Sequence, residues 1–180
     1  VYQGNQLPQT RDPIEGHDSR PKPPSLIMVS VGEVAPDFTL MANDRSMVTL
    51  SEIGKRTVLA FYPAAFTGVC TAEMCTFAES MNTLEQANAT ILGISADNIF
   101  ANNEFASVHG IGFPLLCDVQ CSAIEAYGLA LHDFGAPGFT ASQRAVFVIE
   151  PDCSVGFAWV AENPGVEPDY EAVVSYCLSS

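Results

Sequence analysis

Positively charged residues are scarce in this sequence. Its 180 residues include seven lysines and arginines against 21 aspartates and glutamates, which gives a net charge of −14. Three of the cations and three of the acids precede Met28, so the rest of the chain has 18 acids and four cations: Arg45, Lys55, Arg56 and Arg144. Such a surface repels nucleic acid and anionic membranes, so we expect neither as a partner. An acid-rich, lysine-poor surface also resembles those of halophile proteins, with an acidic protein of other origin as the alternative.

Long apolar segments are missing as well. No apolar run approaches the roughly 18 residues of a membrane-spanning helix, although 48% of the residues are hydrophobic. Residues 1–27 contain five prolines and lack the apolar stretch of about 7–15 residues that a secretory signal has. We therefore expect a disordered tail at 1–27, one globular domain at 28–180 with Met28 as its natural start, and a cytoplasmic location.

The cysteines do not form a disulfide-rich or metal-binding pattern. Six cysteines in a chain of this length are too few for a dense disulfide scaffold, so we expect free thiols. Cys117 and Cys121 have no third and fourth ligand nearby at zinc spacing, and Cys70 and Cys75 do not continue into an iron–sulfur motif. The sequence therefore predicts no metal and no cofactor.

Hydrophobic periodicity predicts strands and helices that alternate along the chain. We expect a strand that ends at Leu40, further strands near 47–50, 57–62, 90–95, 144–150 and 154–161, a short strand within 110–117, helices near 70–86, 96–108, 122–127 and 167–178, and a loop at 128–141. Helices between successive strands, followed by an antiparallel pair, are typical of an α/β fold. The expected architecture is a central mixed β-sheet flanked by helices.

One stretch joins a strand, a loop and a helix around a cysteine. Residues 57–62 are apolar and β-branched, Pro63 ends this strand, and a short loop leads to Cys70 at the start of a helix. The first turn of a helix has unpaired N–H groups and a partial positive charge, which favour a thiolate at Cys70. Thr67 can place a hydroxyl beside the sulfur. This arrangement indicates a reactive cysteine, with a buried structural cysteine as the alternative.

Pro63, Thr67 and Cys70 form the pattern Pro-x-x-x-Thr-x-x-Cys. This pattern resembles the active-site signature of the peroxiredoxins, which are thiol peroxidases with a thioredoxin-like fold, and the similarity continues through most of residues 28–180. The resemblance implies that Cys70 attacks a hydroperoxide and becomes a sulfenic acid. It also implies that Pro63 fixes the loop and keeps water from the sulfur, although a plain strand-ending proline explains Pro63 equally well.

Arg144 begins the segment Arg-Ala-Val-Phe-Val-Ile, which is otherwise suited to a buried strand. A guanidinium at such a position needs a partner. Peroxiredoxins are similar here, with an arginine at the head of a late strand beside the reactive sulfur. The resemblance implies that Arg144 stabilises the thiolate and positions the peroxide, whereas an exposed strand end with a surface ion pair is the alternative.

The position of Cys75 bears on which type of peroxiredoxin the sequence resembles. The spacing from Cys70 to Cys75 resembles the Q-type, or bacterioferritin-comigratory, peroxiredoxins, whose resolving cysteine lies five residues after the peroxidatic one, whereas residues 113–162 also resemble the one-cysteine E-type branch. On a continuous helix the two side chains would point about 140° apart and lie about 7.5 Å apart along the axis, so a disulfide requires local unwinding. Cys75 is our candidate resolving thiol, with a small buried helix residue as the alternative and Cys177 as second candidate.

The sequence therefore predicts a thiol-dependent peroxidase that reduces hydrogen peroxide and small organic hydroperoxides. The resemblance implies a Cys70–Cys75 disulfide, recycling by a thioredoxin-like or other thiol reductant, and a homodimer as one expected oligomeric state. One alternative is a one-cysteine peroxiredoxin resolved by an external thiol. A thioredoxin-type disulfide oxidoreductase would have Cys-x-x-Cys at this junction, and a non-catalytic binding module would have an unreactive Cys70.

Overall fold

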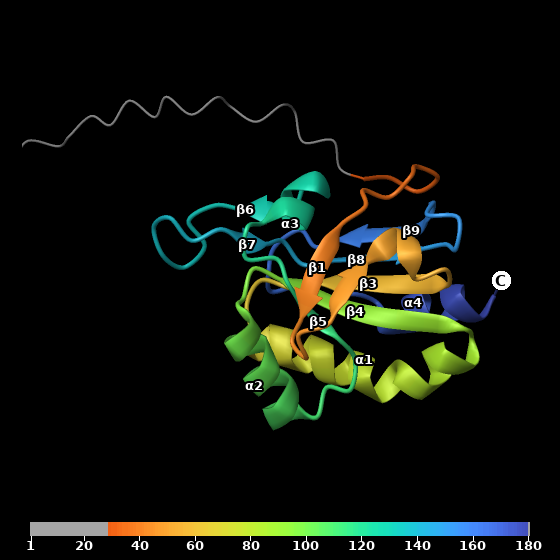
Figure 1. The fold of residues 1–180 in the computed structure, drawn as a ribbon, viewed down its shortest axis with the longest axis horizontal. Helices are drawn as coiled ribbons and strands as arrows, with labels where there is room; N and C mark the ends of the chain where they lie inside the picture. Colours follow the sequence, from red (N-terminus) through yellow and green to blue (C-terminus); the bar gives the residue numbers. More distant parts are fainter. Residues whose placement is uncertain (1–28, 180) are drawn as a thin grey trace, which may run out of the picture.

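The computed structural model describes residues 29–179 and is built around a seven-stranded sheet with the order β2-β1-β5-β4-β3-β8-β9 (Figure 1). Its strands are β1 (Thr39–Ala42), β2 (Met47–Thr49), β3 (Arg56–Phe61), β4 (Ala89–Ser95), β5 (Leu115–Cys117), β8 (Ala145–Ile149) and β9 (Val155–Val160). Strands β3, β4 and β5 are parallel, and the other neighbouring pairs are antiparallel. The sheet is mixed, as predicted. The tail expected at residues 1–27 lies outside the described residues.

Helices cover both faces of this sheet. They are η1 (Leu50–Glu52), α1 (Gly68–Gln86), α2 (Ile99–His109), α3 (Ser122–Ala126) and α4 (Tyr170–Leu178), and a two-stranded ribbon joins β6 (Ala130–Leu131) to β7 (Ala141–Ser142). Figure 1 shows α1 and α2 on one side of the sheet and α3 with the β6–β7 ribbon on the other. The predicted α/β class with flanking helices is confirmed. No helix within residues 29–179 combines the length and apolarity needed to cross a membrane.

Two buried clusters form the core, one on each face of the sheet. On the α1 face, Met74 and Phe77 pack with Phe105 of α2 and Val173 of α4. On the other face, residues of the N-terminal segment and α3 pack against the sheet, with the Tyr127 ring 5.2 Å from that of Phe147. Strand β3 lies between the two clusters, so its side chains are buried on both faces. This double burial explains its continuous apolar run.

Several predicted element boundaries differ from the structure. Helix α1 begins at Gly68, so Cys70 lies inside its first turn and does not open it. Helix α4 begins at Tyr170, not near residue 167, because the Asp169 side chain accepts a hydrogen bond from Ala172 N–H and caps the helix there. The loop predicted at 128–141 contains β6 and β7, whose two-residue length is too short to give a periodic signal.

The sheet brings three chain segments to one edge. Phe61, the last residue of β3, pairs with Ile94 in parallel strand β4 and with Ala145, the first residue of β8. The loop after β3, the segment after β4 and Arg144 before β8 therefore leave the sheet side by side. The candidate site lies at this edge.

Candidate active site

Cys70 is the third residue of α1 and has only 1% of its surface exposed. The preceding Thr67 has extended backbone angles, φ −82° and ψ 148°, so the helix begins directly after it. The N–H groups of the first turn have no acceptor inside the helix. Together with the helix dipole they favour negative charge on the Cys70 sulfur.

Arg144 is buried beside this sulfur. Its Nη2 lies 3.4 Å from Cys70 Sγ, and only 1% of the residue is exposed. Its Nη1 donates a hydrogen bond to the Glu73 carboxyl, while Nε and Nη2 donate to the Pro164 carbonyl at 3.2 and 2.8 Å. Each guanidinium nitrogen thus has an acceptor, which fixes the plane of the group next to the sulfur. Arg144 is not an exposed strand end.

Glu73 completes the polar cluster. It lies one turn after Cys70 on α1 and is fully buried, and its Oε1 has no hydrogen-bond partner among the described residues. Burial raises the pKa of Glu73 to about 8, although the neighbouring Arg144 opposes the rise. For Arg144 itself, burial acts to lower the pKa, but Glu73 and Cys70 outweigh it and the pKa is raised. The guanidinium therefore keeps its charge, and Glu73 holds its proton more tightly than an exposed glutamate does.

Sequence reasoning missed two parts of this cluster, Glu73 and Pro164. Glu73 had a readable signal: it lies three residues after Cys70 and adjoins the apolar stripe that includes Met74, where a carboxyl group needs a partner. Pro164 contributes only its backbone carbonyl, and a carbonyl contact leaves no trace in the residue type.

The other two loop residues lie next to the cysteine in the chain but differ in exposure. Pro63 is buried directly after Tyr62, the residue that follows β3. Thr67 is exposed, and its hydroxyl donates to the Ala64 carbonyl at 3.0 Å. Within residues 29–179 the predicted contact between this hydroxyl and the sulfur is not among the hydrogen bonds. The catalytic roles of Pro63 and Thr67 remain predictions.

Cys75 is half-buried on the same uninterrupted helix as Cys70, and all six cysteines are free thiols. Helix geometry displaces the two residues by about 7.5 Å along the axis, so a disulfide between them requires the first turns of α1 to unwind. Cys177 is a poorer partner. Its carbonyl accepts from Arg56, which begins β3, so Cys177 lies at the opposite end of the strand that leads to Cys70. Burial also raises the pKa of the Cys177 thiol to about 11.

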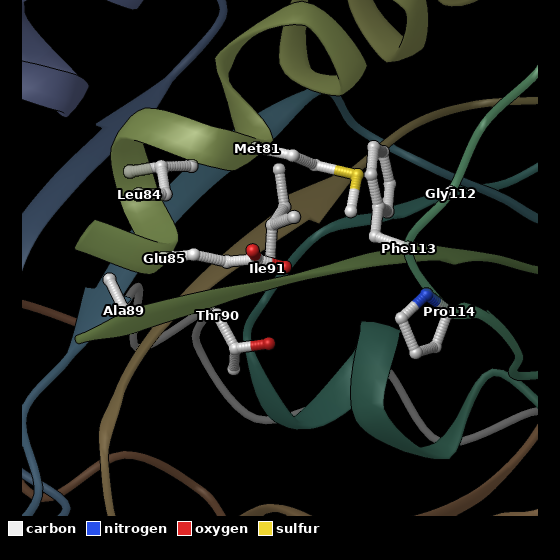
Figure 2. Close-up of a pocket in the computed structure, with 9 residues that line it drawn as sticks. All are labelled: Met81, Leu84, Glu85, Ala89, Thr90, Ile91, Gly112, Phe113 and Pro114. Carbon is white, nitrogen blue, oxygen red and sulfur yellow. The ribbon is translucent and has the colours of Figure 1, made fainter. Parts of the chain in front are cut away.

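A pocket lies away from this cluster, at the far end of α1 (Figure 2). Its volume is about 110 Å³, and it is lined by Met81, Leu84, Glu85, Ala89, Thr90, Ile91, Gly112, Phe113 and Pro114. Met81 follows Cys70 by roughly 16 Å along the helix axis, so the pocket has no part in chemistry at the sulfur. Elsewhere in residues 29–179, no group of three or more His, Cys, Asp or Glu side chains could hold a metal ion.

Comparison with known proteins agrees with this geometry. Residues 31–158 match the model of the AhpC/TSA family. The chain belongs to the AhpC/TSA family. It is 32% identical over 134 residues to a peroxiredoxin bcp from Coxiella burnetii, which covers 73% of this chain and 88% of that protein. It is also 38% identical over 112 residues to the chloroplastic peroxiredoxin Q of Triticum aestivum, covering 61% of this chain and 52% of that longer protein.

Solved structures of AhpC/TSA proteins have the same fold. Peroxidoxin BcpB from Mycobacterium tuberculosis superposes with a TM-score of 0.73 at 27% identity, covering 83% of this chain and 96% of that one. A mutant of PrxQ from Xylella fastidiosa superposes with a TM-score of 0.72 at 26% identity, covering 82% of this chain and 94% of that one. The comparisons confirm the resemblance to peroxiredoxins, the thioredoxin-like fold and the thiol-peroxidase class expected from the sequence. As a member of this family the chain acts on a peroxide and is reduced by a thiol.

Proposed function

We propose that Cys70 is the peroxidatic thiol and that Arg144 is its electrostatic partner. The observation that carries this proposal is the 3.4 Å separation between Arg144 Nη2 and Cys70 Sγ, both buried at the start of α1. A buried cation at that distance stabilises a thiolate far more than an exposed one does, because water does not screen it.

In the proposed reaction the Cys70 thiolate attacks one oxygen of a hydroperoxide. A sulfur–oxygen bond forms, the oxygen–oxygen bond breaks, and the other oxygen leaves as hydroxide or alkoxide, which takes up from solvent the proton that the Cys70 thiol released when it ionised. Cys70 becomes a sulfenic acid, and the peroxide is reduced to water or an alcohol. Arg144 and the N–H groups of the first helical turn can donate to the oxygens as negative charge moves onto them.

Neighbouring groups support this chemistry. Because Glu73 has a raised pKa, it retains its proton more readily, which leaves the charge of Arg144 available to the thiolate. The Pro164 carbonyl holds the guanidinium from the side away from Glu73, so its donors stay aimed at the sulfur. Pro63 shields the sulfur and Thr67 orients the peroxide once it enters, which are the roles we assign to them.

Replacing the nucleophile tests the assignment. Cys70→Ser should abolish peroxidase turnover, because a hydroxyl at this position is not ionised near neutral pH. Cys153→Ser is the matched control, since Cys153 lies in the turn between β8 and β9, is a half-buried free thiol, and should be dispensable. Substantial turnover in Cys70→Ser, measured as peroxide consumed in the presence of a dithiol, would reject the proposal.

For resolution we propose that the Cys75 thiol attacks the Cys70 sulfenic acid, so that a disulfide forms and water leaves. A thioredoxin-like dithiol then reduces the disulfide by exchange. Support comes from the position of both cysteines on α1 and from the similarity to proteins named peroxiredoxin Q. In Cys75→Ser the first oxidation should proceed and thioredoxin-driven cycling should stop. Unchanged cycling would favour the alternative, a one-cysteine enzyme resolved by an external thiol.

We further propose a cytoplasmic location and a homodimer as the form in solution. Six free thiols suit a reducing compartment, which supports the location. The family includes multimeric members, which supports the dimer. Sedimentation velocity of the reduced protein gives the oligomeric state, and a monomer at micromolar concentration would contradict the homodimer.

A further inference from the structure

A side chain from the neighbouring strand holds the loop that precedes Cys70. The Ala65 N–H donates a hydrogen bond to Asp97 Oδ2 at 2.8 Å. Asp97 follows β4 by two residues and is half-buried. Because β4 runs parallel to β3, Asp97 and the loop lie at the same edge of the sheet. The contact therefore joins two segments that are 32 residues apart in the sequence.

This contact is part of a buried hydrogen-bond network. The Ser95 hydroxyl donates to Asp97 Oδ2 at 2.9 Å and accepts from Asn102 Nδ2 at 3.4 Å. Asn102 Oδ1 in turn accepts from the Tyr62 hydroxyl at 2.8 Å. Ser95, Asn102 and Tyr62 are fully buried. Both the start of the loop, at Tyr62, and its middle, at Ala65, are thus tied to the same group of polar side chains.

The charge of Asp97 alone would work against a thiolate. A carboxylate near the catalytic edge disfavours a second negative charge there, whereas its hydrogen bond fixes the loop backbone at Ala65. The charge of Asp97 should therefore slow the reaction at Cys70, whereas its hydrogen bond to the loop should speed it. The buried partners of Asp97 show that the side chain is built into the loop support, so we expect the positional effect to dominate.

We propose that Asp97 is a positioning residue for the reaction at Cys70. By accepting the Ala65 N–H it sets the shape of the loop through which the peroxide reaches the sulfur. This inference rests on the proposed role of Cys70. Displacing a reacting group by about 1 Å can reduce a rate by roughly 100-fold, so loss of this anchor should slow the peroxide reaction.

The experiment compares two rates in Asp97→Ala and Asp97→Asn. The first is the second-order rate constant for oxidation by hydrogen peroxide, followed through Trp159 fluorescence. The second is the rate at which neutral iodoacetamide alkylates Cys70. Alkylation needs the thiolate but does not require a peroxide to be positioned beside it. In Asp97→Ala the peroxide rate should fall by at least about tenfold and the alkylation rate by less than about threefold. Asp97→Asn retains an oxygen acceptor and should stay within about threefold of the unmodified protein in both.

Asp118→Ala is the matched control. Asp118 also lies just beyond a parallel strand and is buried, but its carboxylate accepts from Ser122 and Ile124 N–H in α3 and does not contact the loop. The Asp118→Ala protein should be less stable than the unmodified protein but should react with hydrogen peroxide at the same rate. An Asp97→Ala protein as fast as or faster than the unmodified protein would overturn the proposal, and so would an Asp97→Asn protein as slow as Asp97→Ala.

Hydrogen exchange in the unmodified protein tests the contact without relying on a variant that folds. The Ala65 amide should exchange at least about tenfold more slowly than in the unfolded chain, since it donates to Asp97. Exchange at the unfolded-chain rate would overturn the proposal. If Cys70→Ser retains turnover, the proposed function fails. If Cys70→Ser is inactive and the Asp97 variants are unaffected, only the positioning role fails.

Discussion

At the scale of single residues, the site depends on how one guanidinium distributes its donors. Arg144 contacts the Cys70 sulfur, the Glu73 carboxyl and the Pro164 carbonyl, so rotation of its plane would break at least one buried hydrogen bond. A buried donor or acceptor left without a partner costs about 1–3 kcal/mol. The protein thus holds the cation in one orientation before the peroxide arrives.

Replacing Arg144 with lysine should therefore remove more than charge. A lysine ammonium cannot reach all three acceptors, so Arg144→Lys should lower the peroxide rate constant by about 100-fold or more. Arg56→Lys is the matched control, because Arg56 is paired with Glu150 at 2.9 Å and lies at the other end of β3. Stopped-flow oxidation by hydrogen peroxide gives the rate constant of each variant. Equal losses in the two variants would show that only stability had changed.

Glu73 should make stability depend on pH. Its pKa is about 8 in the folded protein against an ordinary value of 4.5, so the folded state binds the proton more tightly. The stability from that proton is fully present below pH 4.5 and is lost as the pH rises towards about 8. Glu73→Gln cannot lose a proton here. Between pH 5 and 8 it should gain stability relative to the unmodified protein, by on the order of a few kcal/mol.

Urea unfolding of both proteins at several pH values in that range measures the difference. Contributions from the other acids, which the two proteins share, cancel in the comparison. A difference that is constant or falls with increasing pH would mean that Glu73 is ionised in the folded protein throughout this range.

Sequence reasoning identified those site residues whose chemical type is unusual for their place. A cysteine at a strand–loop–helix junction and an arginine at the head of an apolar strand both stand out, and the structure brings Cys70 and Arg144 together. Glu73 was missed because a glutamate on a helix is usually exposed. Asp97 was missed because its partner is a backbone N–H 32 residues earlier in the chain.

At the scale of elements, α1 has two opposing tasks. Its first turn holds Cys70 for the peroxide, yet the same turn must unwind if Cys75 is to form a disulfide with it. Gly68 is the first residue of the helix, and no atom lies within 4 Å of where a Cβ would be. The sequence thus has a flexible residue at the point where unwinding would begin.

Gly68→Ala should stabilise the first turn of α1 by about 0.5–1 kcal/mol. Because the helix must open before the thiols meet, disulfide formation should slow by roughly twofold to fivefold. The peroxide step should be unaffected, since it uses the intact helix. Rapid-quench mass spectrometry resolves the two steps. Faster disulfide formation in this variant would contradict the unwinding step.

Long periodic elements were predictable and short ones were not. The strands and helices of the main sheet were found because burial on one or two faces leaves a repeating apolar pattern. The β6–β7 ribbon has two residues per strand, with Ala130 paired to Ser142 and Leu131 to Ala141, so no period can develop. Helix α1 begins at Gly68, two residues before the predicted start at Cys70, because the low helix propensity of glycine hides its first turn in the sequence.

At the scale of the whole molecule, negative charge dominates the surface. After Met28 there are 18 acids and four cations, of which Arg144 is buried and Arg56 is paired with Glu150. Repulsion among surface acids destabilises the compact state, and salt screens it over about 10 Å at 0.1 M and about 3 Å at 1 M. The halophile hypothesis rests on this repulsion and its screening by salt, and it remains a prediction.

The free energy of unfolding should therefore rise as sodium chloride increases from about 0.05 to 1 M. Replacing the exposed acids Glu52 and Glu104 with lysine reduces the net charge and should make that rise smaller. Denaturant unfolding at each salt concentration measures both proteins. Stability that is flat or falls with salt in the unmodified protein would contradict the charge argument.

The role of Cys70 as the peroxidatic thiol is tested most directly by a single turnover with hydrogen peroxide and no reductant. Trp159, the one tryptophan in the chain, pairs with Val146 in the strand that Arg144 precedes and reports the reaction. A sulfenic acid trap followed by mass spectrometry then locates the oxidised sulfur. If Cys70 is the peroxidatic thiol, oxidation should give one rapid phase with the trapped sulfenic acid on Cys70. Slow oxidation spread over several cysteines, with Cys70 no more reactive than the rest, would contradict it.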